Sequence, residues 1–461
     1  MGYEMASGIP ITIAINHDKN AIDMHSKNHP GTIHLTEDIF NVDLRKYLRK
    51  GDVVRLMWAS PDCTSHSKAK GGQPRISGLR ILPWAVYRLC EQIKEATGRL
   101  PELIIMENVE EIQQWGPLDE NGHPIKQKAG EDYQKFINAM KKLGFEFDSR
   151  ELVAADYGAP TTRKRWYAIF RSDDREIVWP EPTHNRFGTD GLKPWIPISN
   201  CIDFADLGKS IFDRKKPLAE KSQIRIANGV EKFIIKDPNR FIVPDKDAMA
   251  FLIQYHSETR AGDCRGQSLN EPIKTIDTSN RYALVTAFIA KYYKTGTGQS
   301  LNEPIHTITT SPGHFALVTA FLVKYYGNGI GQSVREPIGT ITTKDRFGLC
   351  SVVFEIEGEK YIIYDIFLRM LKPEELKLGQ GFTKDYIIDF NVDGRHYPVS
   401  EQVARIGNSV VPVVAKALIE VNKGTVSEKM GENTEHADRR QQGAVGVCDI
   451  GGSNENRVNR R

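Results

Sequence analysis

A cysteine and a glutamate stand at equivalent places in this sequence, each shortly after an apolar run. Cys63 closes the segment Ala59-Ser60-Pro61-Asp62-Cys63, and Glu107 opens Glu107-Asn108-Val109 directly after the run from Leu103 to Met106. A thiolate is a strong nucleophile, and a carboxylic acid can donate a proton to a substrate. These residue types at these places indicate covalent catalysis.

The elements around the two residues predict that they meet. Residues 53 to 58 and 103 to 106 are rich in β-forming apolar side chains, and between them Val86, Leu89, Cys90 and Ile93 recur at helical spacing. This pattern is typical of a βαβ unit with parallel strands. Ligands bind at the carboxyl ends of parallel strands, so we expect Cys63 and Glu107 to face one crevice.

More polar segments are expected at the same edge of the sheet. Asn16-His17-Asp18 follows a strand-like run at 11 to 15, and Glu37-Asp38-Ile39 follows a shorter one at 32 to 35. Arg163 and Arg165 lead into a strand-like run at 166 to 170, and residues two apart on a strand share a face. Near the C-terminus, residues 407 to 412 are expected to open a helix that runs through Glu420.

In these motifs the chain resembles the C5-cytosine-specific DNA methyltransferases of phage or restriction-modification type. The matching motifs, in family order, are Pro61-Asp62-Cys63, Glu107-Asn108-Val109, Thr161-x-Arg163-x-Arg165 with threonine replacing glutamine, Gln380-Gly381-Phe382 and Gly407-Asn408-Ser409-Val410. One short motif is weak, but five in order over most of the chain are specific. The resemblance implies an α/β fold: a Rossmann-like methyltransferase domain dependent on S-adenosylmethionine, with a smaller, mainly β target recognition domain.

The resemblance also implies a mechanism and its catalytic residues. Cys63 would add to C6 of a cytosine flipped out of double-stranded DNA, and Glu107 would hold N3 as a protonated carboxyl. Arg163 and Arg165 would steady the cytosine O2 and the flanking phosphate. S-adenosylmethionine would supply the methyl group to C5, after which loss of the C5 proton and β-elimination free Cys63.

The cofactor site implied by the resemblance draws on several segments. Asp38 and Ile39 would hold the adenine, His17 would lie against its face, and Asn16 would bond a ribose hydroxyl. Pro61, Leu79 and Asn408 complete the set. The segment from Thr64 to Gly78 carries cations for DNA phosphates and glycines typical of a mobile loop.

One departure from the family lies at the start of the chain. The family opens with a strand and a glycine-rich Asp-Leu-Phe-x-Gly-x-Gly-Gly segment, whereas residues 1 to 5 resemble the helix that follows it. We therefore expect a miscalled start codon or a truncated protein. Loss of that strand would leave a central position of the sheet empty.

Other interpretations remain open at this stage. A lone cysteine is usually a buried apolar residue, Glu107 could cap a helix, and the arginines could be surface cations. Asn408 and Ser409 could simply begin a helix. His66 lies close to Cys63 in sequence, but sequence adjacency is poor evidence for a Cys-His hydrolase. As a whole, the chain could also be a truncated, catalytically impaired DNA-binding relative, or an RNA cytosine C5-methyltransferase.

The domain pattern changes after residue 171. We expect a catalytic domain at 1–171, a target recognition domain at 172–351, a return to the catalytic domain at 352–422 and a disordered tail at 423–461. The recognition domain holds repeats near 251–285, 286–318 and 319–350, each with a Thr-Ile pair (275, 307 and 340) expected to be a short strand. Candidate base-reading side chains are Lys274, Arg281, His306 and Lys344, or variable insertions at 259–265 and 294–298.

Composition fits an intracellular globular protein. The 461 residues carry a net charge of +3, which is too small to demonstrate nucleic-acid binding. Six cysteines without close pairs argue against a zinc site and a disulfide scaffold. No segment suits a membrane or a signal peptide. We expect a cytoplasmic monomer without metal, whose partners are DNA and, in a restriction-modification system, a cognate endonuclease.

Overall fold

The computed structural model describes residues 1–61, 82–255, 264–291, 321–324, 332–333, 347–350, 353–356, 359–423 and 443–448. It divides into two compact units. Unit 1 comprises 1–196, 274–279 and 376–461, and unit 2 comprises 197–273 and 280–375. These boundaries differ from the expected ones at 171 and 351, and the short segment 274–279 of the repeat block belongs to unit 1.

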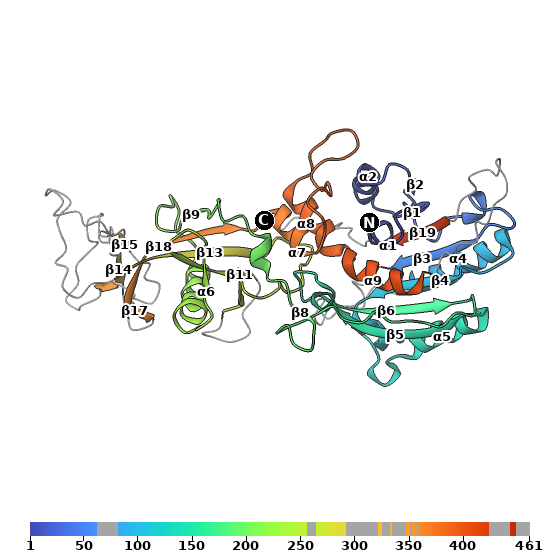
Figure 1. The fold of residues 1–461 in the computed structure, drawn as a ribbon, viewed down its shortest axis with the longest axis horizontal. Coiled ribbons are helices and arrows are strands. Elements are labelled where there is room, and N and C mark those ends of the chain that lie inside the picture. The colour runs from blue at the N-terminus through green and yellow to red at the C-terminus, as the bar shows by residue number, and fades with distance from the viewer. Residues whose placement is uncertain are drawn as a thin grey trace. The chain divides into compact units, whose positions relative to one another are not determined.

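Unit 1 is built on a seven-stranded sheet in the order β2-β1-β19-β3-β4-β6-β5 (Figure 1). The first five strands in this order pair in parallel with one another, whereas β6 is antiparallel to both β4 and β5. The strands are β1 (Ile13–Ile15), β2 (Ile33–Leu35), β3 (Val54–Ser60), β4 (Leu103–Asn108), β5 (Glu146–Val153), β6 (Lys164–Arg171) and β19 (Gly443–Cys448). The predicted strands at 11–15, 32–35, 53–58, 103–106 and 166–170 are confirmed within a few residues.

Alternate side chains of the sheet supply two separate cores. Met57 and Ile104 pack in one core with α4 (Leu82–Thr97) and α5 (Glu131–Leu143). Trp58 and Ile105, the next residue of each strand, pack in the other core with α1 (Gly2–Ser7) and α9 (Pro412–Asn422). Helices cover both faces, as the continuous apolar runs of β3 and β4 require. The predicted βαβ unit of β3, α4 and β4 is confirmed.

The remaining elements of unit 1 are short. They include α2 (Lys19–Asn28), α8 (Val399–Asn408), the ribbon of β7 (His184–Asn185) and β8 (Lys193–Pro194), and 3-10 turns at Leu44–Lys46, Glu110–Gln114, Lys126–Lys128 and Ala154–Tyr157. Asp18 caps α2 by accepting hydrogen bonds from the backbone N–H groups of Asn20 and Ala21, at 2.9 and 3.3 Å.

The motif at 407 to 412 joins two helices instead of opening one. Gly407 and Asn408 are the last residues of α8, and α9 begins at Pro412. Proline suits this first position because it lacks the N–H that a helix start leaves unbonded, and its φ is already helical. The expected helix start at Gly407 is therefore wrong, as is the alternative that Asn408 and Ser409 begin a helix.

The central position of the sheet is filled. β19 pairs with β1 on one side and with β3 on the other, parallel to both. The expectation of an empty position is therefore wrong. The expectation of a disordered tail at 423–461 is also wrong for Gly443–Cys448, which form this strand.

Unit 2 is mainly antiparallel β structure. One sheet has the order β10-β11-β13-β18-β17, with β12 beside β11 and β9 beside β18, and β15-β14-β16 form a second sheet. Helix α6 (Glu220–Val230) continues into a π-helical turn, Glu231–Ile235, and contributes Ile226 and Val230 to a core with Phe251 and Ile253 of β11. The strands are β9 (Lys209–Ser210), β10 (Phe241–Ile242), β11 (Ala248–Gln254), β12 (Gly266–Ser268), β13 (Tyr282–Lys291), β14 (Phe321–Lys324), β15 (Gln332–Ser333), β16 (Phe347–Cys350), β17 (Val353–Ile356) and β18 (Glu359–Met370); a 3-10 turn spans Ile198–Cys201, and α7 spans Pro373–Gly379.

The first repeat differs from its expected form. Thr275 and Ile276 are not in a strand, and they belong to unit 1. The matching pairs at 307 and 340 lie outside the described residues. The strand expectation for the first Thr-Ile pair is therefore wrong.

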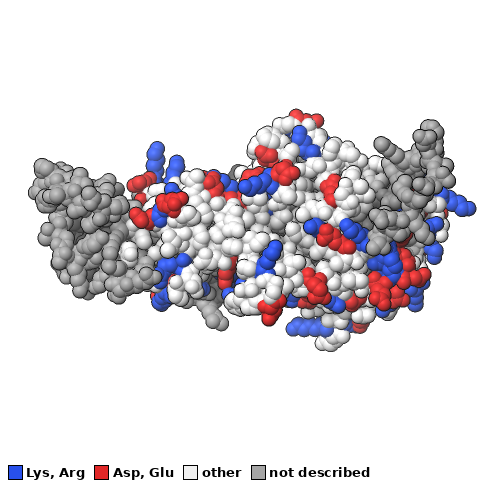
Figure 2. Space-filling view, in the orientation of Figure 1, with Lys and Arg blue, Asp and Glu red and all other residues white. Residues whose placement is uncertain are grey.

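Charged side chains of both signs are mixed on the visible surface (Figure 2). The Lys164 ammonium contacts the carboxylates of Glu110 and Glu151, for example. Such mixing accords with the small net charge of +3. In the described parts of the chain, no helix combines the length and apolar character needed to cross a membrane.

Candidate functional site

The carboxyl ends of β3 and β4 are tied together by a buried asparagine. Asn108, the last residue of β4, donates a hydrogen bond from Nδ2 to the carbonyl oxygen of Pro61 at 3.0 Å, and its Oδ1 accepts the N–H of Val109 at 2.9 Å. Its side chain is 1% exposed, so an unsatisfied amide here would be costly. The bond fixes the first residue after β3 beside Glu107.

Cys63 itself, like Leu79, lies outside the described residues. It follows Pro61 by two residues in the sequence. Its predicted place beside Glu107 stays a prediction.

Glu107 forms an ion pair with one of the two predicted arginines. Arg165 Nε lies 3.3 Å from Glu107 Oε1, and their side chains are 15% and 10% exposed. The pair forms because β6 runs antiparallel to β4, which places the start of β6 beside the end of β4. A nearly buried carboxylate and a guanidinium, which has only hydrogen-bond donors, therefore lie together at this edge of the sheet.

Arg163 has a different position from Arg165. It precedes β6, is 5% exposed, and donates from Nη1 to the carbonyl oxygens of Gly407 at 3.0 Å and Ile276 at 3.5 Å. The buried Thr161 hydroxyl accepts the N–H of Arg163 at 3.2 Å. The expectation that the two arginines share a face on one strand is therefore wrong, and Arg163 links the end of α8 to the segment 274–279.

Gly407 permits this link because it has no side chain. A Cβ added at Gly407 would lie 2.1 Å from the carbonyl oxygen of Asp277 and 2.8 Å from the backbone nitrogen of Thr278. Both contacts are to backbone, which cannot rotate away as a side chain could. The glycine of the Gly-Asn-Ser-Val motif therefore makes room for residues 274–279.

We expect Gly407→Ala to destabilise unit 1 by about 1–3 kcal/mol, because over-packing forces the backbone apart. Thermal melting followed by circular dichroism would show a lower midpoint. Gly31→Ala is the matched control, because its new Cβ would meet no atom within 4 Å. Equal midpoints for the two variants would refute the close approach at Gly407.

The described residues expected to hold a cofactor are in different settings. Asn16 follows β1, is buried, and accepts the N–H of Asp18 through Oδ1 at 2.8 Å. His17 and Asp38 are exposed, and Asp38 Oδ1 accepts the N–H of Phe40 at 2.8 Å. Ile39 packs in the core beneath α4. Pro61 is buried at the end of β3, and Asn408 is half-buried at the end of α8.

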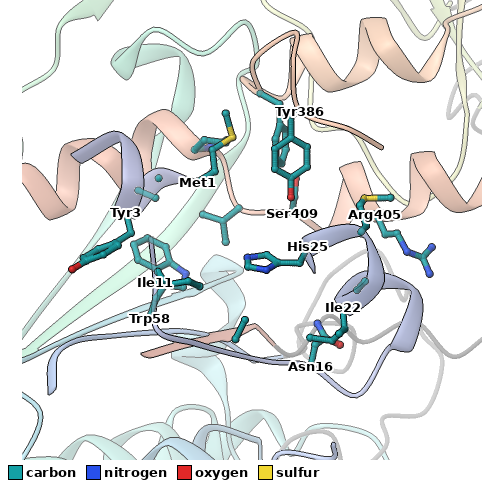
Figure 3. A pocket seen from close by; sticks show the side chains of 18 of the residues that line it. Met1, Tyr3, Ile11, Asn16, Ile22, His25, Trp58, Tyr386, Arg405 and Ser409 are labelled. Carbon is teal, nitrogen blue, oxygen red and sulfur yellow. The ribbon is translucent and has the colours of Figure 1, made fainter. Parts of the chain in front are cut away.

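A largely apolar cavity of about 210 Å³ lies in unit 1, on the side of the sheet that carries α1 and α9. Among the predicted cofactor residues that the structure describes, Asn16 alone lines this cavity. Figure 3 shows the rings of His25 and Tyr386 pointing into the space that Met1, Ile11 and Trp58 border. Ser409 and Arg405, from the end of α8, add polar groups to the wall.

Three histidines cluster beside this cavity. His25 Nδ1 lies 2.8 Å from His34 Nε2, the rings of His25 and His29 are 4.4 Å apart, and His29 Nδ1 lies 3.0 Å from Glu4 Oε1. Burial, aided by the charges of His29, the N-terminal amine and His34, holds the pKa of His25 well below its usual range. Burial also lowers the pKa values of His29 and His34, and for His29 it outweighs the Glu4 carboxylate. Among the described residues, no group of three or more His, Cys, Asp or Glu side chains is arranged to hold a metal ion.

The depressed histidine pKa values predict acid sensitivity. At pH values above the unfolded-state histidine pKa of about 6.5, the three histidines are neutral in both the folded and the unfolded state. Below that pH, they bind protons in the unfolded chain but stay neutral in the folded cluster. The free energy of unfolding should therefore fall as the pH drops below about 6.5, down to the folded-state pKa values. Melting midpoints measured between about pH 7.5 and 5.5 would check this. His25→Gln is expected to reduce the change of the midpoint with pH. His123→Gln, at a side chain that is 46% exposed, is the control and should leave that change as it is.

Some contacts around the site were not predicted. Three of them link segments far apart in sequence. They are the hydrogen bond of Asn108 to Pro61, the ion pair of Arg405 Nη2 with Asp18 Oδ2 at 3.1 Å, and the hydrogen bond from Gln380 Nε2 to the Ser409 carbonyl at 3.1 Å. The quoted Glu-Asn-Val and Gln-Gly-Phe motifs contained two of these residues, but no spacing in the sequence revealed their partners.

The chain is similar to several known methyltransferases. The chain is 26% identical over 193 residues to the type II methyltransferase M.SacI of Streptomyces achromogenes, covering 39% of this chain and 44% of that protein. It is 30% identical over 266 residues to the type II methyltransferase M1.HphI of Haemophilus parahaemolyticus, covering 56% and 65% respectively. The chain thus spans less than two thirds of either relative. A solved structure of the Entamoeba histolytica methyltransferase EhMeth is 15% identical, with 91% and 92% of the chains covered and a TM-score of 0.42.

The family comparison covers most of the chain. The model of the C-5 cytosine-specific DNA methylases matches residues 1–423, a range that includes the Asn108 tether, the pair of Glu107 and Arg165, and the α8–α9 junction. The chain therefore belongs to the C-5 cytosine-specific DNA methylase family.

Proposed function

We propose that this protein transfers a methyl group from S-adenosylmethionine to C5 of a cytosine in double-stranded DNA. The observation that carries the proposal is the hydrogen bond from Asn108 to Pro61, because it holds the start of the Cys63 segment beside Glu107. Arg165, 3.3 Å from the Glu107 carboxylate, completes the set of groups that the reaction needs.

Each group has one task in the proposed reaction. The Cys63 sulfur forms a bond to C6 of the cytosine, and electron density moves towards C5 and N3. The Glu107 carboxyl, when protonated, donates a hydrogen bond to N3, and Arg165 donates to O2. Bound S-adenosylmethionine would supply the methyl group to C5, and S-adenosylhomocysteine would leave as its S–CH3 bond breaks. A base then removes the C5 proton, and the C6–S bond breaks to release Cys63 and 5-methylcytosine.

The target base has to leave the duplex before the thiol can reach C6. Flipping costs a few kcal/mol of unstacking, which contacts to the DNA backbone and the pocket must offset. The cations of the segment 64–78 are proposed for those contacts; this segment lies outside the described residues.

The cofactor residues remain those named from the sequence: Asn16, His17, Asp38, Ile39, Pro61, Leu79 and Asn408. Asn16 has the best structural support, because it is buried at the carboxyl end of β1 and borders the cavity. Its amide nitrogen is a suitable donor to a ribose hydroxyl. Arg163 is reassigned from catalysis to positioning, because its guanidinium bonds the carbonyl of Gly407.

Unit 2 is proposed as the target recognition domain. Its antiparallel sheets are separate from the catalytic sheet, and loops between antiparallel strands can present side chains to base edges. Among the candidate readers, Lys274 belongs to unit 1 and Arg281 donates to the Tyr255 carbonyl at 3.4 Å, while His306 and Lys344 lie outside the described residues. A cytoplasmic monomer acting beside a cognate endonuclease remains part of the proposal.

Mass-spectrometric detection of 5-methylcytosine tests the function. The chain is incubated with duplex DNA of varied sequence and S-adenosylmethionine whose methyl group carries deuterium, with RNA of matching sequence in a parallel reaction. Deuterated 5-methylcytosine in DNA is expected. Product in RNA alone would favour the RNA methyltransferase, and no product in either, despite intact folding, would favour the impaired DNA-binding relative.

A further inference from the structure

The carboxyl edge of the catalytic sheet continues from β4 across β6 to β5. Val153, the last residue of β5, pairs with Lys164, the first residue of β6, beside the ion pair of Glu107 and Arg165. Neighbouring strands lie about 4.8 Å apart, so the end of β5 is about 10 Å from β4. That distance corresponds to about three base pairs of DNA, which rise about 3.4 Å each. A duplex that brings a cytosine to Glu107 can therefore contact structure at the end of β5.

The ribbon of β7 and β8 is attached to this end of β5. The N–H of Thr183, which precedes β7, donates to the carbonyl of Asp156 at 2.9 Å, and Nε1 of Trp195, which follows β8, donates to the Asp156 carboxylate at 2.9 Å. Asp156 belongs to the 3-10 turn directly after β5. A Cβ added at Gly158, where this turn ends, would lie 2.8 Å from the His184 ring, so the ribbon packs closely on the turn. The ribbon is thus fixed at the carboxyl edge (Figure 1).

The loop that joins β7 to β8 is held in one shape by Asn185. Its Oδ1 accepts the N–H groups of Phe187 and Thr189, both at 3.1 Å, and its Nδ2 donates to the carbonyl and the hydroxyl of Thr189, both at 3.0 Å. The N–H of Leu192 also donates to the Thr189 carbonyl, at 3.0 Å. These bonds fix the loop before any partner binds, which lowers the entropy cost of binding.

This loop presents one aromatic side chain to solvent. Phe187 is 77% exposed, the highest value for a large hydrophobic side chain among the described residues. The Arg186 guanidinium lies 5.5 Å from the centre of its ring. Single exposed apolar side chains are common on protein surfaces, so exposure alone does not indicate a partner. The position of this ring, on a fixed loop at the edge where the proposed reaction takes place, does indicate one.

The charges around the ring indicate how a partner would be bound. Arg186 and Lys193 are exposed cations, and Glu181 and Asp190 are exposed carboxylates, so the four charges cancel. Attraction to phosphates is therefore small, and the contact depends on the ring of Phe187. Aromatic rings stack on bases of any sequence, and apolar side chains of DNA-bending proteins insert between base pairs. A guanidinium on one face of the ring leaves the other face for a base.

We propose that the loop 185–192 contacts duplex DNA close to the target cytosine, with the Phe187 ring stacked on a base that its insertion partly unstacks. This inference rests on the proposed function, which brings DNA to this edge of the sheet. The ring replaces part of the base stacking that flipping removes, so it favours the flipped state. Because every base has a flat face, the contact acts at any sequence and leaves the choice of target to other residues.

Equilibrium binding of DNA tests the ring. Fluorescence anisotropy of labelled duplexes of mixed sequence, with the full chain and no cofactor, should show an affinity about tenfold lower in Phe187→Ala. Phe187→Trp keeps a ring that stacks and should bind as the unsubstituted chain does. Tyr47→Ala is the matched control and should not change the affinity, because Tyr47 is an aromatic residue 39% exposed between β2 and β3. All three variants should keep the melting midpoint, because each replaced side chain is exposed.

Three results would overturn the proposal. The first is equal affinity in Phe187→Ala and the unsubstituted chain. The second is an equal loss in Phe187→Ala and Phe187→Trp, since the stacking of the ring would then play no part. The third is a weaker salt dependence in Phe187→Ala. A stacking contact leaves the slope of log affinity against log salt unchanged, whereas the loss of phosphate contacts reduces it.

The outcomes separate this inference from the proposed function. Weaker DNA binding in Phe187→Ala that Phe187→Trp restores, in a chain that methylates no cytosine, would support the inference and refute the function. Unchanged DNA affinity in Phe187→Ala, in a chain that methylates cytosine, would overturn the inference and leave the function standing.

Discussion

Exchange of the Cys63 thiol for a hydroxyl in Cys63→Ser is expected to lower the rate of methyl transfer at least about 10³-fold. A serine hydroxyl is almost fully protonated at neutral pH, whereas a thiol with a pKa of about 8.5 provides a usable thiolate fraction. The proposed reaction begins with addition to C6, so the loss should appear in single-turnover kinetics.

The rest of the molecule should be unaffected by this change. Cofactor affinity and the melting midpoint are expected to match those of the unsubstituted chain, because serine keeps the length and branching of the cysteine side chain. Cys90→Ser is a useful comparison: Cys90 is fully buried in the core with α4, so its replacement should affect stability instead of chemistry. Methyl transfer that survives Cys63→Ser would exclude covalent catalysis by this residue.

Glu107→Gln is the second change with a large expected effect. Glutamine keeps the shape of the side chain but cannot deliver a proton to N3, so methyl transfer should fall about 10²- to 10⁴-fold. The ion pair with Arg165 is lost in the same variant. The measurement is single-turnover methylation with saturating DNA and cofactor, which separates chemistry from binding.

A nearby glutamate provides the control for this variant. Glu151, on β5, pairs with Lys164 at the start of β6 and is exposed by about a third, so Glu151→Gln removes a carboxylate from the same region without touching the proposed base pocket. Its rate should stay within about twofold of the unsubstituted chain, because exposed ion pairs contribute little. Similar losses in Glu107→Gln and Glu151→Gln would mean that general electrostatics, and not a specific proton donor, explain the effect.

The sequence predicted those elements of unit 1 whose residue pattern is visible within one short stretch of the chain. β3, α4 and β4 were identified because long apolar runs and helical spacing are visible within a few residues. β19 was not predicted, because Gly-Ala-Val-Gly-Val-Cys contains two glycines and no large side chain. What makes it a strand is the position between β1 and β3, which no window of sequence around residue 445 contains.

The candidate site likewise has features that the sequence predicted and features that it did not. The nearness of Pro61 to the end of β4 followed from the rule that parallel strands end at one edge, and the pair of Glu107 and Arg165 agrees with the motif order. The different role of Arg163 could not be foreseen. Its partners at 276 and 407 come from segments with no pattern that links them, and only the missing side chain of Gly407 allows their approach.

The origin of β19 also determines the order in which the catalytic sheet can be assembled during synthesis. All six of its other strands are translated before β19, so until then β1 and β3 have no partner between them. Two unpaired strand edges with apolar faces are a template for wrong pairing and aggregation. The nascent protein therefore has to keep its unfinished centre protected until the strand that joins the two halves of the sheet has been synthesised.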